Sequence, residues 1–327
     1  MNIKFSPNIL HLIVSTKCNI KCRHCHQNAN GENELILTEE ELSPVIIEAG
    51  KLGIRRIVIM GGEIFLFPEL VNALIKISHD NSLNVSFATN GYWGKSSEAA
   101  ESVMDLLENA GWYQHENSFC CDDILISAGE FHQEWLSSST IKTAISAYHS
   151  RFKKPIYIDF EYTEGKRNLV EQFIENMSSL PEKSYIISQI RTNFYKFGRT
   201  IPLSDTEMHS KHYIDFSPCP WIDRIVIHSN GEIYPCCGYN DNNPGLCIGN
   251  MHLGNISDII SAANKSFIIK LLLNIPMGLT YGILKKRHPD LPTFFSNHCE
   301  LCEIICKPEY RIELENEFRS NLSGIVE

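Results

Sequence analysis

The sequence predicts an α/β fold, either a parallel sheet or a partial barrel. Six short runs rich in Ile and Val have the pattern of buried strands, at 9–15, 56–60, 85–88, 124–127, 156–160 and 185–190. Amphipathic segments typical of helices lie between them, at 38–52, 68–79, 96–110, 139–152 and 168–180. Strands that alternate with helices favour parallel pairing, because each helix carries the chain back to the start of the next strand.

Local signals support these elements in chain order. Thr38, followed three residues later by Glu41, has the form of a capping box and predicts a helix start. Around residue 205 the pattern changes: 225–228 and 232–235 flank Ser229-Asn230-Gly231, which indicates a β-hairpin with an Asn-Gly turn. We therefore expect two domains, residues 1–205 and 206–327, and a last helix over 308–322.

Net charge, apolar runs and cysteine content exclude several classes of function. The chain has 327 residues and a net charge of −10, so a nucleic-acid partner is not expected. No signal peptide and no uncharged run of 18 apolar residues is present, which predicts a cytoplasmic protein without a membrane span. In a reducing compartment, clusters among the 12 cysteines indicate metal binding or catalysis rather than disulfides.

The first cysteine cluster follows the first predicted strand. Cys18, Cys22 and Cys25 have the spacing CxxxCxxC, and in an α/β barrel this position is a loop where active sites collect. Three thiolates can hold three irons of a [4Fe–4S] cluster and leave the fourth iron open to a substrate or cosubstrate. A structural zinc site, completed by His24 or His26, is the alternative.

Three motifs together resemble the radical S-adenosylmethionine (SAM) superfamily. They are CNIKCRHC, Gly61-Gly62-Glu63 at the end of the second strand, and Thr89-Asn90-Gly91 at the end of the third. The resemblance implies a partial (β/α)6 TIM-like barrel in which a [4Fe–4S] cluster binds SAM. It implies SAM contacts for Gly61, Gly62, Glu63, His24, Thr89, Asn90, Ser127 and Arg199. The chain departs from the family pattern at Ile64, often a proline, and at Gly129, often an acid.

The second cysteine cluster consists of Cys219, Gly231-xxxx-Cys236 and Cys299-Glu-Leu-Cys302. This pattern resembles the auxiliary-cluster module called twitch, a shortened SPASM domain. Seven cysteines lie between residues 219 and 306. The resemblance implies a small C-terminal twitch-like iron–sulfur domain with a second [4Fe–4S] cluster on Cys219, Cys236, Cys299 and Cys302. Cys306 is a rival fourth ligand, and a zinc knuckle is the alternative.

Cys237 directly follows an expected cluster ligand in EIYPCC. Because neighbouring residues on a strand point to opposite faces, Cys237 could face the barrel mouth as a free thiol. It could also be a buried structural cysteine. With Glu130-Phe131-His132 and TNGYWG, this segment resembles radical SAM peptide epimerases, in which the second cysteine of the pair returns a hydrogen atom. Cys120 and Cys121 are expected to be packing residues or part of a helix–strand connection. Cys247 lies in a glycine- and asparagine-rich loop and is not among the expected ligands, although an auxiliary-ligand role is its alternative.

The resemblance implies a function with several partners. We expect conversion of L- to D-residues in a ribosomally made precursor peptide, by Cα hydrogen abstraction with a 5′-deoxyadenosyl radical and hydrogen return from Cys237. An electron donor such as flavodoxin or ferredoxin is implied. Only 17 residues precede Cys18, so peptide recognition is expected to use the barrel or the twitch surface. The alternatives are an oxidative maturase that forms thioether or carbon–carbon cross-links, an enzyme acting on a sugar, and a non-catalytic metal-binding regulator.

Overall fold

The structure is a computed structural model that describes residues 3–30, 34–113, 122–163, 165–191, 199, 210–237 and 244–321. Cys120 and Cys121 lie outside the described residues. Among the described helices, none is long and apolar enough by itself to cross a membrane; only the pair 267–274 and 277–287, bent by 115°, passes that test by length and composition.

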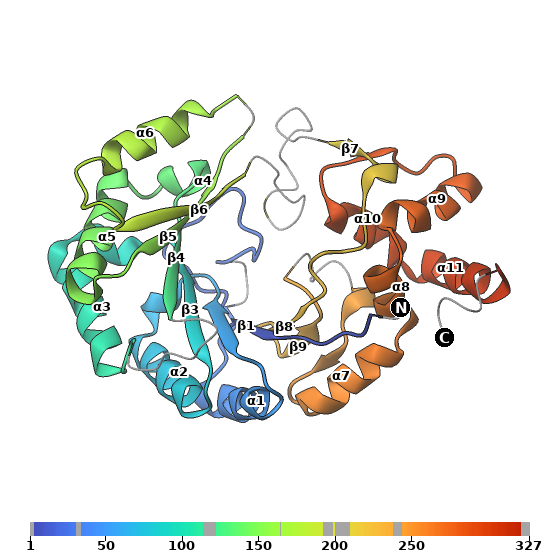
Figure 1. Cartoon of the computed structure of the whole chain (residues 1–327), viewed down its shortest axis with the longest axis horizontal. Coiled ribbons are helices and arrows are strands. Elements are labelled where there is room, and N and C mark those ends of the chain that lie inside the picture. Colours follow the sequence, from blue (N-terminus) through green and yellow to red (C-terminus); the bar gives the residue numbers. More distant parts are fainter. Residues whose placement is uncertain are drawn as a thin grey trace.

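Six parallel strands form the first part of a curved sheet (Figure 1). They are β1 (Ile9–Ile13), β2 (Arg56–Met60), β3 (Asn84–Thr89), β4 (Asp123–Ser127), β5 (Ile156–Glu161) and β6 (Tyr185–Arg191). The connecting helices are α1 (Glu39–Lys51), α2 (Pro68–Asp80), α3 (Ser97–Asn109), α4 (Glu130–Gln133), α5 (Ser138–Phe152) and α6 (Asn168–Met177). The predicted α/β fold is confirmed, and so is the capping box of Thr38 and Glu41 at the start of α1.

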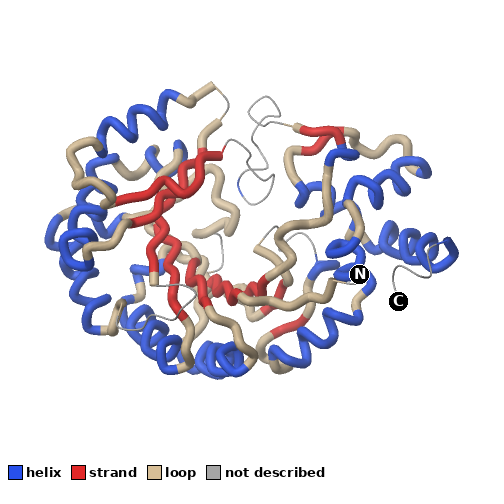
Figure 2. The backbone as a smooth tube through the Cα atoms, viewed as in Figure 1, coloured by secondary structure: helices blue, strands red, loops and turns tan. Residues whose placement is uncertain are grey.

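The two faces of this sheet have different environments. Along β2, Ile57 and Ile59 are fully buried, whereas Arg56, Val58 and Met60 are partly exposed. The same alternation runs along β4. Figure 2 shows the helices on the outer rim and the strands inside them. Since successive side chains of a strand point to opposite faces, the apolar set packs under the helices and the other set faces the concave interior, here called the lumen.

The chain after residue 210 extends the same sheet. β8 (Arg224–Ile227) pairs in parallel with β1, and β9 (Glu232–Tyr234) pairs antiparallel with β8. β10 (Gly249–Asn250) completes the order β10-β9-β8-β1-β2-β3-β4-β5-β6 over the described strands. Gly231 has φ +82°, so the turn between β8 and β9 uses a left-handed conformation that glycine adopts without strain. The predicted hairpin is confirmed, and it joins the barrel sheet directly.

Helices cover the remaining C-terminal part. They are α7 (Ile256–Lys265), α8 (Phe267–Asn274), α9 (Met277–Arg287), α10 (His298–Ile305) and α11 (Pro308–Asn321), with a small pair of strands, β7 (Lys211–His212) and β11 (Phe294–Phe295). The predicted last helix is α11. The start of the chain packs here too: the Asn264 side chain of α7 bonds both the N–H and the C=O of Phe5, at 2.9 Å each.

Candidate functional site

The loop of Cys18, Cys22 and Cys25 directly follows β1 and packs on α4. Its three cysteines join a small apolar cluster with Ile20 and Phe131. Asn30 fixes the loop from within: its Oδ1 accepts from the Cys18 N–H at 2.8 Å, and its Nδ2 donates to the Cys18 carbonyl at 2.7 Å. Burial raises the pKa of the Cys18 thiol to about 11 and that of Cys22 to about 12. Iron binding here must therefore displace thiol protons.

Two arginines fix the position of this loop: Arg23 belongs to the loop, and Arg199 contacts it from another part of the chain. Arg23 donates from Nε and Nη2 to Glu134 Oε1, at 3.0 and 2.8 Å, and lies 4.7 Å from the centroid of the Phe131 ring. Arg199 donates from Nε to the Cys22 carbonyl at 2.7 Å, and its backbone N–H donates to the Cys25 carbonyl. Arg199 thus lies against the cysteine loop, where it donates hydrogen bonds to the carbonyls of Cys22, Cys25 and Ala29.

The two glycines of the Gly61-Gly62-Glu63 segment touch the cysteine loop. A Cβ on Gly61 would lie 2.6 Å from the Ser15 carbonyl oxygen, and one on Gly62 would lie 2.0 Å from that of Lys17. The Gly62 N–H donates to the Ser15 carbonyl at 2.7 Å, and the Glu63 N–H donates to that of Lys17 at 2.9 Å. Because glycine has no side chain, the backbone after β2 can lie close to residues 15–17 and form hydrogen bonds with them, just before the cysteine loop.

Glu63 joins the ends of β2 and β3. Its carboxylate accepts from Thr89 Oγ1 at 2.7 Å, from the Asn90 N–H at 2.8 Å and from the Phe65 N–H at 3.2 Å. Burial raises its pKa, and these three hydrogen bonds act against that rise. Asn90 also donates to Asn19 Oδ1 at 2.9 Å. The structure thus brings the three motifs together around one corner of the lumen.

A charged group at the end of β5 was missed by the sequence analysis. Glu161 accepts from His24 Nε2 at 3.3 Å and pairs with Arg191 at 2.8 Å. These partners hold the pKa of Glu161 far below its ordinary value, against the opposing effect of burial. The His24 ring packs on Phe131, with centroids 4.9 Å apart. The rule that functional side chains follow barrel strands would have found Glu161, as it found Ser127 at the end of β4.

Glu130 has a different set of partners. Its Oε2 accepts from the Thr163 N–H and Oγ1, at 2.9 and 2.8 Å, and Lys166 donates to its Oε1 at 2.5 Å. At the neighbouring Gly129, a Cβ would lie 2.3 Å from the Glu161 carbonyl oxygen. Close packing of α4 against β5 therefore accounts for the glycine at this position.

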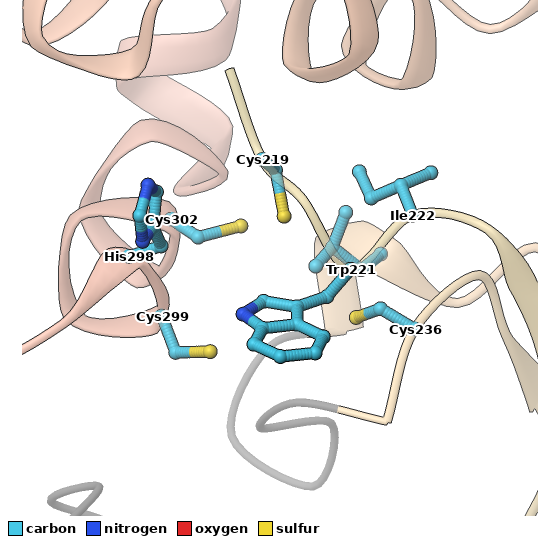
Figure 3. Close-up of a pocket in the computed structure, with 8 residues that line it drawn as sticks. Cys219, Trp221, Ile222, Cys236, His298, Cys299 and Cys302 are labelled. Atoms are coloured by element: carbon cyan, nitrogen blue, oxygen red, sulfur yellow. The ribbon is translucent and has the colours of Figure 1, made fainter. Parts of the chain in front are cut away.

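Four cysteines converge on a second site, between the chain before β8 and helix α10. Cys219, Cys236, Cys299 and Cys302 line one cavity, and in Figure 3 their sulfur atoms point toward a common space. Trp221, Ile222, Leu246 and His298 complete its wall. The rival ligand Cys306 is buried behind this wall, with its Sγ 3.6 Å from that of Cys302. The exposed thiol of Cys247 does not line the cavity.

Cys237 lies beside this cavity. β9 ends at Tyr234, so the expectation that Cys236 and Cys237 occupy a strand is wrong; they lie in the bend that follows. They still differ in exposure: Cys236 is buried and Cys237 is exposed. Arg224 Nη1 donates to Cys237 Sγ at 3.5 Å. The pKa of Cys237 is raised, chiefly because surrounding protein displaces water, while the Arg224 guanidinium lowers it in part.

Comparison with protein families matches two segments of the chain. Among the described residues, no group of three or more His, Cys, Asp or Glu side chains is placed to hold a single metal ion. Residues 12–137 match the radical SAM superfamily, and residues 219–273 match SPASM, an iron–sulfur cluster-binding domain. Residues 12–137 thus form a radical SAM domain. The cofactors of the chain are SAM and two [4Fe–4S] clusters, so the zinc alternatives fall away.

Individual relatives add detail. The chain is 23% identical, over 88% of its length and 89% of the relative's, to the "Putative peptide biosynthesis protein YydG" of Bacillus subtilis. It is 28% identical to the "Probable GTP 3′,8-cyclase" of Methanocaldococcus jannaschii, but that match spans only 34% of this chain and 36% of the relative. Among solved structures, "Native anSMEcpe with bound AdoMet" has a TM-score of 0.52 at 14% identity, covering 96% of this chain and 99% of that one. This last likeness supports the fold.

The side chains present fit these cofactors. A loop with three thiols and a separate cavity with four are the two donor sets that an open and a fully ligated [4Fe–4S] cluster require. We propose Cys18, Cys22 and Cys25 as ligands of the SAM-binding cluster, and Cys219, Cys236, Cys299 and Cys302 as ligands of the auxiliary cluster. Glu63, Asn90 and His24 converge on the first of these sites, as expected for residues that contact SAM.

Proposed function

We propose that this radical SAM enzyme is a peptide epimerase that converts L-residues to D-residues in a ribosomally made precursor peptide. The observation that carries the proposal is Cys237, an exposed thiol beside the four-cysteine cavity but not part of its wall. The similarity to a relative named for peptide biosynthesis, along almost the whole of both chains, supports a peptide substrate.

The residues of the chain have separate tasks in this reaction. When bound at the first cluster and reduced, SAM supplies the 5′-deoxyadenosyl radical that removes the Cα hydrogen of the substrate residue. The Cα radical is close to planar, so the side from which hydrogen returns decides the configuration. Cys237 gives up its S–H hydrogen, a Cα–H bond forms on the opposite face, and a thiyl radical remains. One electron from a flavodoxin- or ferredoxin-type donor and one solvent proton restore the thiol.

The state of the Cys237 thiol suits a hydrogen donor. A thiolate has no hydrogen atom to give, and the raised pKa keeps the sulfur protonated at neutral pH. The exposed side chain can also exchange its proton with water between turnovers. The hydrogen delivered to the substrate should therefore come from solvent.

A reaction in D2O tests this proposal. The enzyme, reconstituted without oxygen, is mixed with SAM, a reductant and a short peptide encoded beside its gene, and the peptide is analysed by mass spectrometry. We expect a gain of about one mass unit and a D-residue after hydrolysis, because the thiol exchanges with solvent. Cys237→Ala should lose the label, whereas Cys247→Ala, which removes an exposed thiol outside the cavity wall, should keep it.

Other outcomes identify the alternatives. Loss of about two mass units that persists in Cys237→Ala would mean an oxidative cross-link or dehydrogenation, since these reactions need an electron acceptor and no hydrogen donor. 5′-Deoxyadenosine formed beside an unchanged peptide would point to a small molecule such as a sugar. Absence of 5′-deoxyadenosine with full iron content would point to a non-catalytic regulator.

A further inference from the structure

We propose that Arg224 is a positioning residue that holds the Cys237 thiol in the direction needed for hydrogen delivery. This inference rests on the proposed function and adds a residue to it. Arg224 donates from Nη1 to Cys237 Sγ at 3.5 Å. Because Cys237 follows the end of β9, this contact ties the bend that carries the thiol to the neighbouring strand.

The backbone of Arg224 is held in place by the sheet. Arg224 is the first residue of β8 and lies opposite Ile9 of β1, which on its other side lies opposite Arg56 of β2. Side chains directly opposite each other on paired strands point to the same face. Arg56 begins the partly exposed set of β2, so Arg224 shares the lumen face with it. Both arginines lower the pKa of buried His11, the next residue of β1 on that face.

Two further contacts fix the guanidinium itself. Nε donates to Asp223 Oδ1 at 2.6 Å, and the group lies 5.7 Å from the centroid of the Trp221 ring. The side chain of Arg224 is only 13% exposed. A planar guanidinium held on one edge and near an aromatic ring has few orientations left, so its remaining Nη1 can fix the position of a sulfur atom. Trp221 also lines the four-cysteine cavity. The contacts of Arg224 with Trp221 and with Cys237 therefore fix the position of the Cys237 thiol relative to that cavity.

This arrangement has a kinetic consequence. Hydrogen transfer needs donor and acceptor close together and aligned, and a displacement of about 1 Å can cost on the order of 100-fold in rate. Without Arg224, the Cys237 thiol can still give up a hydrogen atom, but its orientation toward the substrate is no longer fixed. The substrate radical then forms normally and is quenched less often by Cys237, so hydrogen return and SAM cleavage become uncoupled.

The test compares Arg224→Gln and Arg224→Lys with the unchanged enzyme in the D2O reaction. The measured quantity is deuterated D-residue formed per 5′-deoxyadenosine. We expect this ratio to fall at least about tenfold in Arg224→Gln, while 5′-deoxyadenosine formation and iron per chain stay within about twofold. Arg224→Lys, which keeps an N–H donor, should recover part of the ratio. Arg151→Gln on α5, where the partly exposed guanidinium binds carboxylates of α3, is the matched control.

A second readout does not depend on turnover. Alkylation of Cys237 by iodoacetamide, followed by peptide mapping, is measured relative to the exposed Cys247 of the same chain. A guanidinium in contact with the sulfur must alter this relative rate, so we expect a change of at least about threefold in Arg224→Gln and none in Arg151→Gln.

The outcomes separate the two proposals. If Cys237→Ala abolishes labelling and Arg224→Gln keeps both the normal ratio and the normal alkylation rate, the positioning role is wrong and the epimerase proposal stands. If Cys237→Ala keeps the label, the epimerase proposal fails first. An Arg224→Gln protein that loses iron would overturn the positioning role and show that Arg224 is structural.

Discussion

Individual glycine and asparagine residues shape the loop of Cys18, Cys22 and Cys25. Asn30 bonds both the N–H and the C=O of Cys18, and adopts the left-handed conformation with φ +60°. Asparagine tolerates that conformation better than most residues, which explains its use at this position. Gly62, in the chain after β2, lies against the same loop, since the Lys17 carbonyl occupies the space that a side chain would need there.

Gly62→Ala should therefore disrupt the first cluster site. Its Cβ would lie 2.0 Å from the Lys17 carbonyl oxygen and 2.9 Å from the Cys18 nitrogen, and these backbone atoms can only move with the loop. We expect a loss of about 3 kcal/mol or more in the free energy of unfolding, and roughly half of the iron per chain to be lost. Thermal unfolding and iron analysis measure both. Gly254→Ala, where nothing lies within 4 Å, is the control, and equal iron content in the two variants would contradict the argument.

His11 predicts a pH dependence of stability. Burial and the charges of Arg224 and Arg56 lower its pKa to about 3, against 6.5 in an unfolded chain. Between these values the unfolded chain binds one more proton than the folded protein, so stability falls as the pH falls from about 6.5 toward 3. The contribution is roughly 1.4 kcal/mol per pH unit, or about 2 kcal/mol at pH 5.

The measurement is urea unfolding at pH 7.5 and pH 5 for the unchanged protein and for His11→Gln. The loss of stability between the two pH values should be smaller in His11→Gln by about 2 kcal/mol. The comparison uses only the difference between pH values, so a general destabilisation by the substitution cancels. Identical pH dependence in both proteins would show that His11 is not held neutral by its surroundings.

At the scale of elements, one contact links the barrel helices to the C-terminal part. Glu48 of α1 accepts from the first two N–H groups of α7, those of Ile256 at 2.8 Å and Ser257 at 3.0 Å. Asn255 accepts from the next N–H, that of Asp258. A helix N-terminus has N–H groups without partners in the helix and a partial positive charge, so a carboxylate is well suited there.

Glu48→Ala should remove the stabilising contact between α1 and the N-terminus of α7. We expect a loss of about 1–2 kcal/mol in the free energy of unfolding, from two lost hydrogen bonds and the lost charge at the helix end. Glu48→Gln keeps one acceptor oxygen and should lose about half as much. Chemical denaturation measures both, with exposed Glu175→Ala on α6 as the control. A loss in Glu48→Ala no larger than in Glu175→Ala would show that the α7 terminus finds another partner.

How much the sequence predicts also varies by element. The six strands and the five long helices up to residue 180 are predictable because their apolar residues have a clear period of two or 3.6. α8 and α9 are not: α8 is apolar nearly all around, and α9 contains Gly278 and Gly282, which weaken a helix signal. Gly278 is there because a Cβ would lie 2.5 Å from the Tyr213 carbonyl oxygen, a contact that no local pattern reveals.

The candidate site shows the same limit. Residues within recognisable motifs, such as Glu63 and Asn90, are predictable, and the structure brings them together. Partners that lie between motifs are not: Asn30 and Glu134 have no spacing that marks them, and they reach the cysteine loop only through the fold. The role of Arg224 likewise depends on the pairing of β8 with β1, two strands that lie more than 200 residues apart.

At the scale of the whole molecule, that pairing joins the two proposed domains. The boundary near residue 205 separates two kinds of sequence, yet the sheet runs across it from β1 to β8 with four residue pairs in register. The beginning of the chain also lies against the C-terminal helices, through Phe5 and Asn264 and through Ile3 and Asn274. We therefore expect the protein to unfold as one cooperative unit.

A fragment of residues 1–205 tests this expectation directly. It would lose the hydrogen-bonding partner of β1 and expose a strand edge whose residues Leu10 and Leu12 are fully buried in the intact protein. Its first residues would also lose Asn264, which satisfies both backbone groups of Phe5. We expect the fragment to aggregate on size-exclusion chromatography and to show no cooperative thermal transition by circular dichroism.

A fragment of residues 1–237 regains β8 and β9 and should be more soluble, but it should stay less stable than the full chain because α7 is missing. A cooperative transition of the 1–205 fragment within a few degrees of the full chain would instead mean that the barrel closes its own edge, and that β8 only adds to a sheet already folded.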